Sequence, residues 1–166
     1  MKKKELVKAT AADSETRVTP DDHQSLRLWL RLLACTNMID AQIRSRLRVQ
    51  FDTTLPRFDL MAQLERVPNG LKMGELSKRM MVTGGNVTGI TDQLVSEGLV
   101  VREDNPGDRR AYIVKLTPEG RKQFKKMADA HEKWILELFA GLKEADKQGL
   151  YGTLADLKKH LTNIQR

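Results

Sequence analysis

The apolar positions of this chain follow a helical period over most of its length. The first stripe predicts one long helix, with Thr19 as its N-cap, Pro20 in its first turn and apolar residues on more than one side. Its principal apolar positions are Leu28, Leu32, Cys35, Ile39, Ile43 and Leu47. Residues 1–20 show no such period, which predicts a mobile tail.

Three shorter helices and two strands are predicted next. The second helix begins after a break at residues 53–56 and ends near the turn at 68–70. A tight connection at 81–83 joins the third helix to the fourth, which ends at Gly98, a residue typical of helix C-termini. The two predicted strands and the turn between them are residues 99–101, 112–116 and 105–108.

Two more helices close the chain. Thr117 and Pro118 repeat the cap-and-proline start of the first helix. The sixth helix spaces its apolar residues by four and three throughout. Those residues are Leu150, Leu154, Leu157, Leu161 and Ile164. A small monomer does not leave a stripe of this size in water, so we predict that it pairs two copies of the chain.

The order helix, tight turn, helix, strand, turn, strand is that of a winged helix-turn-helix, an arrangement that binds DNA. We expect a mainly α fold with a small β-hairpin wing and a helical dimerisation region. The outward face of the fourth helix is small and polar, so its backbone can approach phosphates and base edges. An arginine on a thin hairpin suits a narrow minor groove. The residues predicted to contact DNA are Ser77, Thr83, Gly84, Gly85, Asn86, Thr88, Gly89, Asp108, Arg109 and Arg110.

These elements divide the chain into three parts. Residues 1–20 form the tail, and residues 53–117 form the winged helix-turn-helix domain that binds DNA. Residues 21–52 and 118–166 together form the helical dimerisation region, built from the first, fifth and sixth helices.

Five short motifs follow one another through the winged part and into the next helix. They are GELSKR at 74–79, GGNVT at 84–88, LVSEGLV at 94–100, DNPGDRR at 104–110 and LTPEG at 116–120. This ordered set resembles the MarR family of bacterial transcriptional regulators, over residues 23–164. The resemblance implies a dimer paired through its terminal helices, with a wing shaped by Asp108 and armed by Arg110. It also implies release of DNA when a small anionic or phenolic ligand binds between the helical and winged parts.

The charge distribution modifies this expectation. The chain carries 29 basic and 22 acidic residues, a net charge of +7, and a basic protein is a candidate for nucleic-acid binding. Residues 71–120, however, hold seven of each sign, and Gly89 and Gln93 stand where many members of the family have basic residues. Either basic residues of the wing and its flanks supply the salt-dependent affinity, or the affinity for DNA is modest.

Arginines recur along the first helix, either as a solvated face or as a site for a carboxylate or phosphate. The stretch LPRFDLM at 55–61 also resembles a MarR subgroup that responds to aromatic acids or their coenzyme A thioesters. We therefore expect a small anionic aromatic effector, free or as an acyl-coenzyme A thioester, between the first, second and fifth helices. His131 can serve there or pack in the core. The expected ligand-binding residues are Trp29, Met38, Arg44, Arg48, Arg57, Phe58, Met61, His131 and Trp134.

Other functional classes find little support. There is no paired nucleophile and base, no metal-ligand spacing and no cofactor motif, so we expect neither an enzyme nor a metal or cofactor site. One cysteine, no bilayer-length apolar run and no signal peptide predict a cytoplasmic protein without a membrane partner. Cys35 lies on the apolar stripe and is predicted to be buried. The alternatives are a regulator that senses oxidants through Cys35 and a winged-helix module that binds protein in place of DNA.

Overall fold

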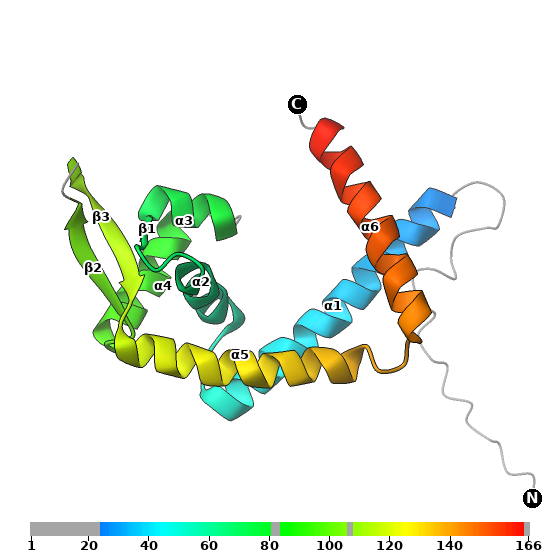
Figure 1. Cartoon of the computed structure of the whole chain (residues 1–166), viewed down its shortest axis with the longest axis horizontal. Coiled ribbons are helices and arrows are strands. Elements are labelled where there is room, and N and C mark those ends of the chain that lie inside the picture. The colour runs from blue at the N-terminus through cyan, green and yellow to red at the C-terminus, as the bar shows by residue number, and fades with distance from the viewer. Residues whose placement is uncertain (1–23, 81–83, 106–107, 165–166) are drawn as a thin grey trace, which may run out of the picture.

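The computed structural model describes residues 24–80, 84–105 and 108–164. The predicted tail, the helix start at Thr19, the connection at 81–83 and the Pro106–Gly107 turn lie outside these residues. None of the described helices is long and apolar enough to cross a membrane. The elements run in the order α1 (Gln24–Phe51), α2 (Leu55–Glu65), β1 (Leu71–Lys72), α3 (Met73–Met80), α4 (Gly84–Ser96), β2 (Val100–Asn105), β3 (Asp108–Leu116), α5 (Pro118–Leu138) and α6 (Glu144–Ile164) (Figure 1).

The winged part packs α2, α3 and α4 against a small antiparallel sheet with the strand order β1–β3–β2 (Figure 1). The mainly helical winged fold predicted from the sequence is confirmed. The first strand was not predicted, because two residues are too few to show a strand period. It forms because Leu71 pairs with Val114 and Lys72 with Ile113. The least exposed core residues are Leu47, Leu60, Met61, Leu64, Leu76, Val87, Leu94, Val100 and Val114.

Gly98 ends α4 and turns the chain into β2, as the sequence predicts. Its φ of +71° lies in the left-handed region, which a glycine adopts without a steric penalty. The amide of Leu99 donates to the carbonyl of Leu94 at 3.0 Å, and that of Gly98 donates to Val95 at 3.0 Å. These two bonds are the pattern that satisfies the last carbonyls of a helix.

Thr117 starts α5 and fastens it to the end of α4. Its hydroxyl accepts a hydrogen bond from the amide of Gly120 at 3.0 Å, and Pro118 takes the first helical position. The same hydroxyl donates to the carbonyl of Gly98 at 2.7 Å. One capping side chain therefore holds α5 against the junction between α4 and β2.

The terminal helices extend away from the winged part (Figure 1). α6 has no buried residue, and its predicted apolar stripe is 37–65% exposed. α1 buries only Ile43 and Leu47, close to its C-terminal end, where α2 and α5 pack against it. The predicted burial of Cys35 is wrong for the single chain: Cys35 is exposed, because none of the described elements buries the N-terminal half of α1.

Candidate nucleic-acid interface and ligand cavity

The helix pair expected to bind DNA is formed by α3 and α4. The helical period turns Val87 and Leu94 of α4 into the core and leaves the opposite face exposed. That face carries three of the predicted contacts, Asn86, Thr88 and Gly89. Of the others, Gly84 and Gly85 open α4, Ser77 is half-buried on α3, and Thr83 lies outside the described residues.

The wing is the antiparallel pair of β2 and β3. Their register ends with Asn105 opposite Asp108, so the predicted residues Arg109 and Arg110 belong to β3 beside the tip of the wing. A hairpin of this kind projects an extended backbone that is thin enough to enter a minor groove.

An ion pair links the wing to α4. Arg102 of β2 lies 2.5 Å from the carboxylate of Asp92, which the sequence places on the outward face of α4. Because both side chains are partly exposed, the pair adds little stability. The sequence pattern gives no signal for Arg102, because a single charged residue in a strand has the same pattern as any solvent-exposed residue.

The aromatic residues assigned to the ligand site pack together between α2 and α5. The ring centroid of Phe58 lies 5.4 Å from that of Phe124 and 5.0 Å from that of His131. His131 lies in turn 6.4 Å from Trp134. Phe58, Met61 and Trp134 are each buried. Phe58, Met61 and Trp134 are therefore part of the hydrophobic core.

Trp29 and Met38 do not join this cluster. Trp29 lies near the start of α1 and Met38 lies at its middle, where they are 56% and 71% exposed. Met38 precedes the buried Leu47 by nine residues, which is about 14 Å along the helix axis. The single chain thus separates these two residues from the aromatic residues with which they were grouped.

The arginines of the predicted anion site also lie apart from one another, on different elements or with different partners. Arg44 pairs with Asp40 one turn earlier on α1, at 2.5 Å. Arg48 is exposed near the end of α1, whereas Arg57 belongs to α2 and pairs with Glu97 beyond the end of α4. These guanidinium groups do not form one continuous row.

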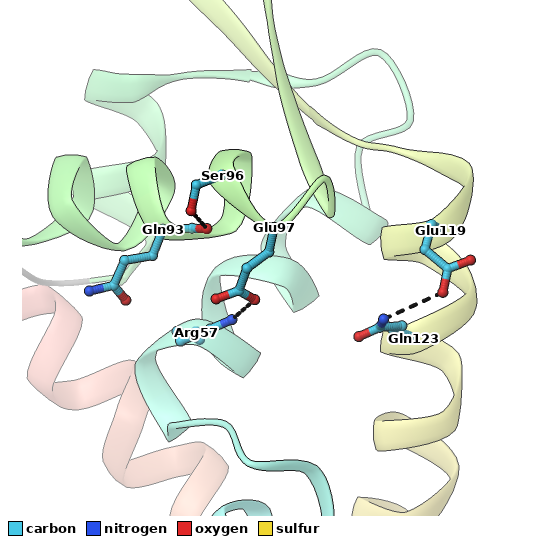
Figure 2. A network of polar contacts seen from close by, with 6 residues as sticks. All are labelled: Arg57, Gln93, Ser96, Glu97, Glu119 and Gln123. Atoms are coloured by element: carbon cyan, nitrogen blue, oxygen red, sulfur yellow. Dashed lines mark hydrogen bonds and ion pairs between the residues drawn. The ribbon is translucent and has the colours of Figure 1, made fainter.

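A cavity of about 460 Å³ does lie between the end of α1, the start of α2, the end of α4 and the first turns of α5. Arg57 and Met61 are the two predicted ligand residues that line it. Figure 2 shows Glu97 reaching from the end of α4 to Arg57, with Glu119 and Gln123 on α5. The complete lining is Phe51, Asp52, Thr53, Arg57, Met61, Glu97, Leu99, Glu119, Gln123, Lys126 and Met127.

His131 has a perturbed acidity. Burial against its aromatic neighbours lowers the pKa of His131 below its usual value of 6.5, and the negative charge of Asp59 opposes this. Burial likewise raises the pKa of Asp59 above 3.8, which the positive charges of Arg44 and His131 oppose.

We expect the free energy of unfolding to decrease as the pH falls through 6.5 toward the lowered pKa of His131. In that window the unfolded chain binds the proton and the folded chain does not. As the pH falls further, through the raised pKa of Asp59 toward 3.8, Asp59 acts in the opposite sense, because the folded chain takes up that proton more readily than the unfolded chain. His131→Gln removes the histidine contribution, so this variant should lose less stability than the parent between about pH 7.5 and about pH 5.5 in urea unfolding. His160→Gln on the exposed α6 is the matched control, and an undiminished loss in His131→Gln contradicts the prediction.

Comparisons with known proteins agree with this architecture. Residues 51–111 match the model of the MarR family. The structure of a MarR family transcriptional regulator from Silicibacter pomeroyi covers 86% of this chain and 99% of its own, with a TM-score of 0.73 and 31% identity. The structure of Sco3205, a MarR family transcriptional regulator from Streptomyces coelicolor in complex with DNA, covers 87% of this chain and 91% of its own, with a TM-score of 0.75 and 20% identity. The uncharacterized HTH-type transcriptional regulator YfiV from Bacillus subtilis is 25% identical over 160 residues, 95% of each chain.

Proposed function

Because this chain belongs to the MarR family of winged helix-turn-helix transcriptional regulators, which are not enzymes, we propose that it is a homodimeric repressor. It binds a pseudo-palindromic operator in double-stranded DNA and is released by a small effector. The observation that carries the proposal is the exposed, small and polar face of α4 beside an arginine-bearing wing. The DNA complex of the fold neighbour Sco3205 supports it.

In this proposal α4 enters the major groove and the wing enters the adjacent minor groove. The contacts are those predicted from the sequence, on α3, α4 and the wing. Since Gly89 and Gln93 bring no charge to α4, the wing and its flanking basic residues supply most of the phosphate contacts. Two subunits place their α4 helices about 34 Å apart, on successive turns of one face of the duplex.

The homodimer is formed through α1, α5 and α6, with residues 21–52 and 118–166 as the dimerisation region and 53–117 as the DNA-binding domain. The support is apolar surface that the single chain leaves exposed: the stripe of α6, and on α1 the side chains of Leu26, Leu28, Trp29, Leu33 and Met38. Exposed apolar surface of this extent is typical of an interface. A second copy covers it symmetrically, and the dimer acts in the cytoplasm, where its operator lies.

Arg110→Ala should weaken operator binding by about tenfold, the loss typical of one base or groove contact, and lower the salt slope by roughly one. The fold should change little, because a residue beside a hairpin tip contributes little core packing. Fluorescence anisotropy with labelled duplex across a salt series measures the first effect, and thermal unfolding measures the second.

Arg121→Ala on α5 is the matched control and should bind the operator as the parent does. A loss of stability in Arg110→Ala with unchanged operator affinity would contradict the assignment of the wing. A parent chain that binds no duplex even at low salt would instead favour the winged-helix module that binds protein.

The effector we propose is an aromatic carboxylic acid, free or as its coenzyme A thioester, bound between the first helices and α5. This proposal is supported by Arg57, whose guanidinium group can bind a carboxylate. Among the described residues it is the only arginine that lines the cavity. The ligand must bind more tightly to a conformation whose two α4 helices do not match the operator, because only differential affinity shifts an equilibrium. A tenfold release of DNA requires about 1.4 kcal/mol of coupling, which one charge-assisted contact can supply.

A further inference from the structure

The guanidinium group of Arg57 has one paired and one unpaired donor on the same edge. Its Nη2 donates to the carboxylate of Glu97 (Figure 2), while its Nε is buried without a hydrogen-bond partner among the described residues. Nε and Nη2 lie on the same edge of a guanidinium group, the edge that binds a carboxylate with two parallel hydrogen bonds. Glu97 makes one of those bonds. The edge therefore keeps one donor without an acceptor, which a carboxylate bound to both donors would satisfy.

The cavity that Arg57 lines has apolar and polar walls. The apolar residues of the lining come from α1 (Phe51), α2 (Met61), α5 (Met127) and the junction between α4 and β2 (Leu99). Its volume of about 460 Å³ falls in the range of small-molecule sites, and polar groups make up the larger part of its accessible lining. An aromatic ring can lie against the apolar side while its polar end faces Arg57.

The charges of the lining select against a simple anion. Two cations, Arg57 and Lys126, face three carboxylates, those of Asp52, Glu97 and Glu119. A monoanionic ligand that takes Arg57 displaces Glu97 and adds a negative charge to a lining that already holds one more carboxylate than cations. A ligand that carries both charges avoids this cost, because its ammonium group can pair with the released Glu97.

We propose that this cavity binds a free α-amino acid with an aromatic side chain, whose carboxylate and ammonium replace the two partners of the Arg57–Glu97 ion pair. The inference rests on the proposed function, since it narrows the effector from aromatic acids in general to those that also carry an amine. It excludes the thioester form, in which the carboxylate is no longer free. Glu97 directly follows α4, so the exchange breaks the ion pair that joins α2 to the end of α4.

Calorimetry with three ligands that share a phenylethyl group tests whether binding requires both the carboxylate and the ammonium group. L-phenylalanine carries both groups, 3-phenylpropanoate lacks the amine, and 2-phenylethylamine lacks the carboxylate. We expect phenylalanine to bind, and each of the other two to bind at least about tenfold more weakly, as expected for the loss of one charge-assisted contact.

Two variants separate a ligand contact from a merely structural ion pair. Arg57→Gln should abolish binding of phenylalanine. Glu97→Gln should weaken phenylalanine by about tenfold, because its ammonium loses a partner, yet tighten 3-phenylpropanoate, because Arg57 is no longer occupied by a competing carboxylate. Arg121→Gln, which disturbs the 3.2 Å pair of Arg121 with Glu65 outside the cavity, should change neither affinity. Thermal unfolding confirms that each variant is folded.

The inference is overturned if phenylalanine, tyrosine and tryptophan all fail to bind the parent chain. It is also overturned if 3-phenylpropanoate binds as tightly as phenylalanine, or if Glu97→Gln weakens both ligands alike. Duplex binding is measured separately by anisotropy. If the chain binds duplex DNA but none of the aromatic amino acids, the inference about the cavity is wrong and the proposed function stands. If the chain binds phenylalanine but no duplex DNA, the proposed function is wrong and the cavity assignment stands.

Discussion

Gly120→Ala is expected to destabilise the fold by about 3 kcal/mol or more, a loss in the range of severe backbone clashes. A Cβ atom on Gly120 would lie 1.9 Å from the carbonyl oxygen of Leu99 and 2.8 Å from its carbonyl carbon. The carbonyl cannot easily move aside, because it accepts a hydrogen bond from the amide of Thr117 at 3.0 Å. The substitution therefore forces α5 away from the junction of α4 and β2. Urea unfolding measures the loss, and the midpoint of thermal unfolding should fall by about 6–12 °C for a chain of this size.

Gly74→Ala in α3 is the matched control. A Cβ atom there meets nothing within 4 Å, so the alanine should add helix propensity and raise the free energy of unfolding by about 0.5–1 kcal/mol. A similar decrease in the free energy of unfolding in both variants would show that replacing any helical glycine destabilises the fold. The close approach of Leu99 to Gly120 would then not be the cause. An unchanged Gly120→Ala protein would mean that α5 can shift along the sheet at little cost.

The double variant Leu154→Glu with Leu157→Glu is expected to yield folded monomers that bind the operator about a hundredfold more weakly or worse. Both leucines belong to the exposed stripe of α6, which contributes no buried residue to its own chain. Charges on this stripe should therefore leave the winged part folded and oppose pairing with a second copy. One subunit alone then contacts one half-site and loses the gain in affinity from linking two half-sites. Sedimentation velocity measures the association state at a chain concentration of about 10 µM, which is far above the dissociation constant of a stable dimer.

Gln148→Glu with Lys159→Glu places two new carboxylates on the opposite face of α6. This control variant should remain dimeric. A parent chain that sediments as a monomer, or a leucine variant that stays dimeric with full operator affinity, would contradict the proposed dimer. Circular dichroism distinguishes loss of pairing from loss of the fold.

The junctions between elements could be predicted from local sequence. The end of α4 at Gly98 and the start of α5 at Thr117 agree with the structure. Both depend on hydrogen bonds within a few residues, such as that between Thr117 and Gly120, so the residue types involved stand next to one another in the chain. The ordered motifs of the winged part could be recognised for the same reason.

The polar residues of the cavity could not be predicted in this way. Arg57 was expected in a ligand site, but its partner Glu97 lies 40 residues away and follows a helix whose own pattern ends before it. Phe58, His131 and Trp134 were placed correctly together, yet they pack as core. Composition and spacing cannot distinguish a filled aromatic cluster from an open slot, because the difference is a matter of a few ångströms between helices.

The sequence by itself determined which residues form helices and strands, where most of them begin and end, and which face of each is apolar. Those properties follow from periodicity, capping and backbone preference, all of which act over a few neighbouring residues. Only the tertiary structure decided what covers each apolar face. The stripe of α1 is buried at Leu47 and exposed at Leu28 and Cys35 although one period runs through all three. Burial depends on whether another element reaches that position in space, and α2 and α5 reach only the last turns of α1.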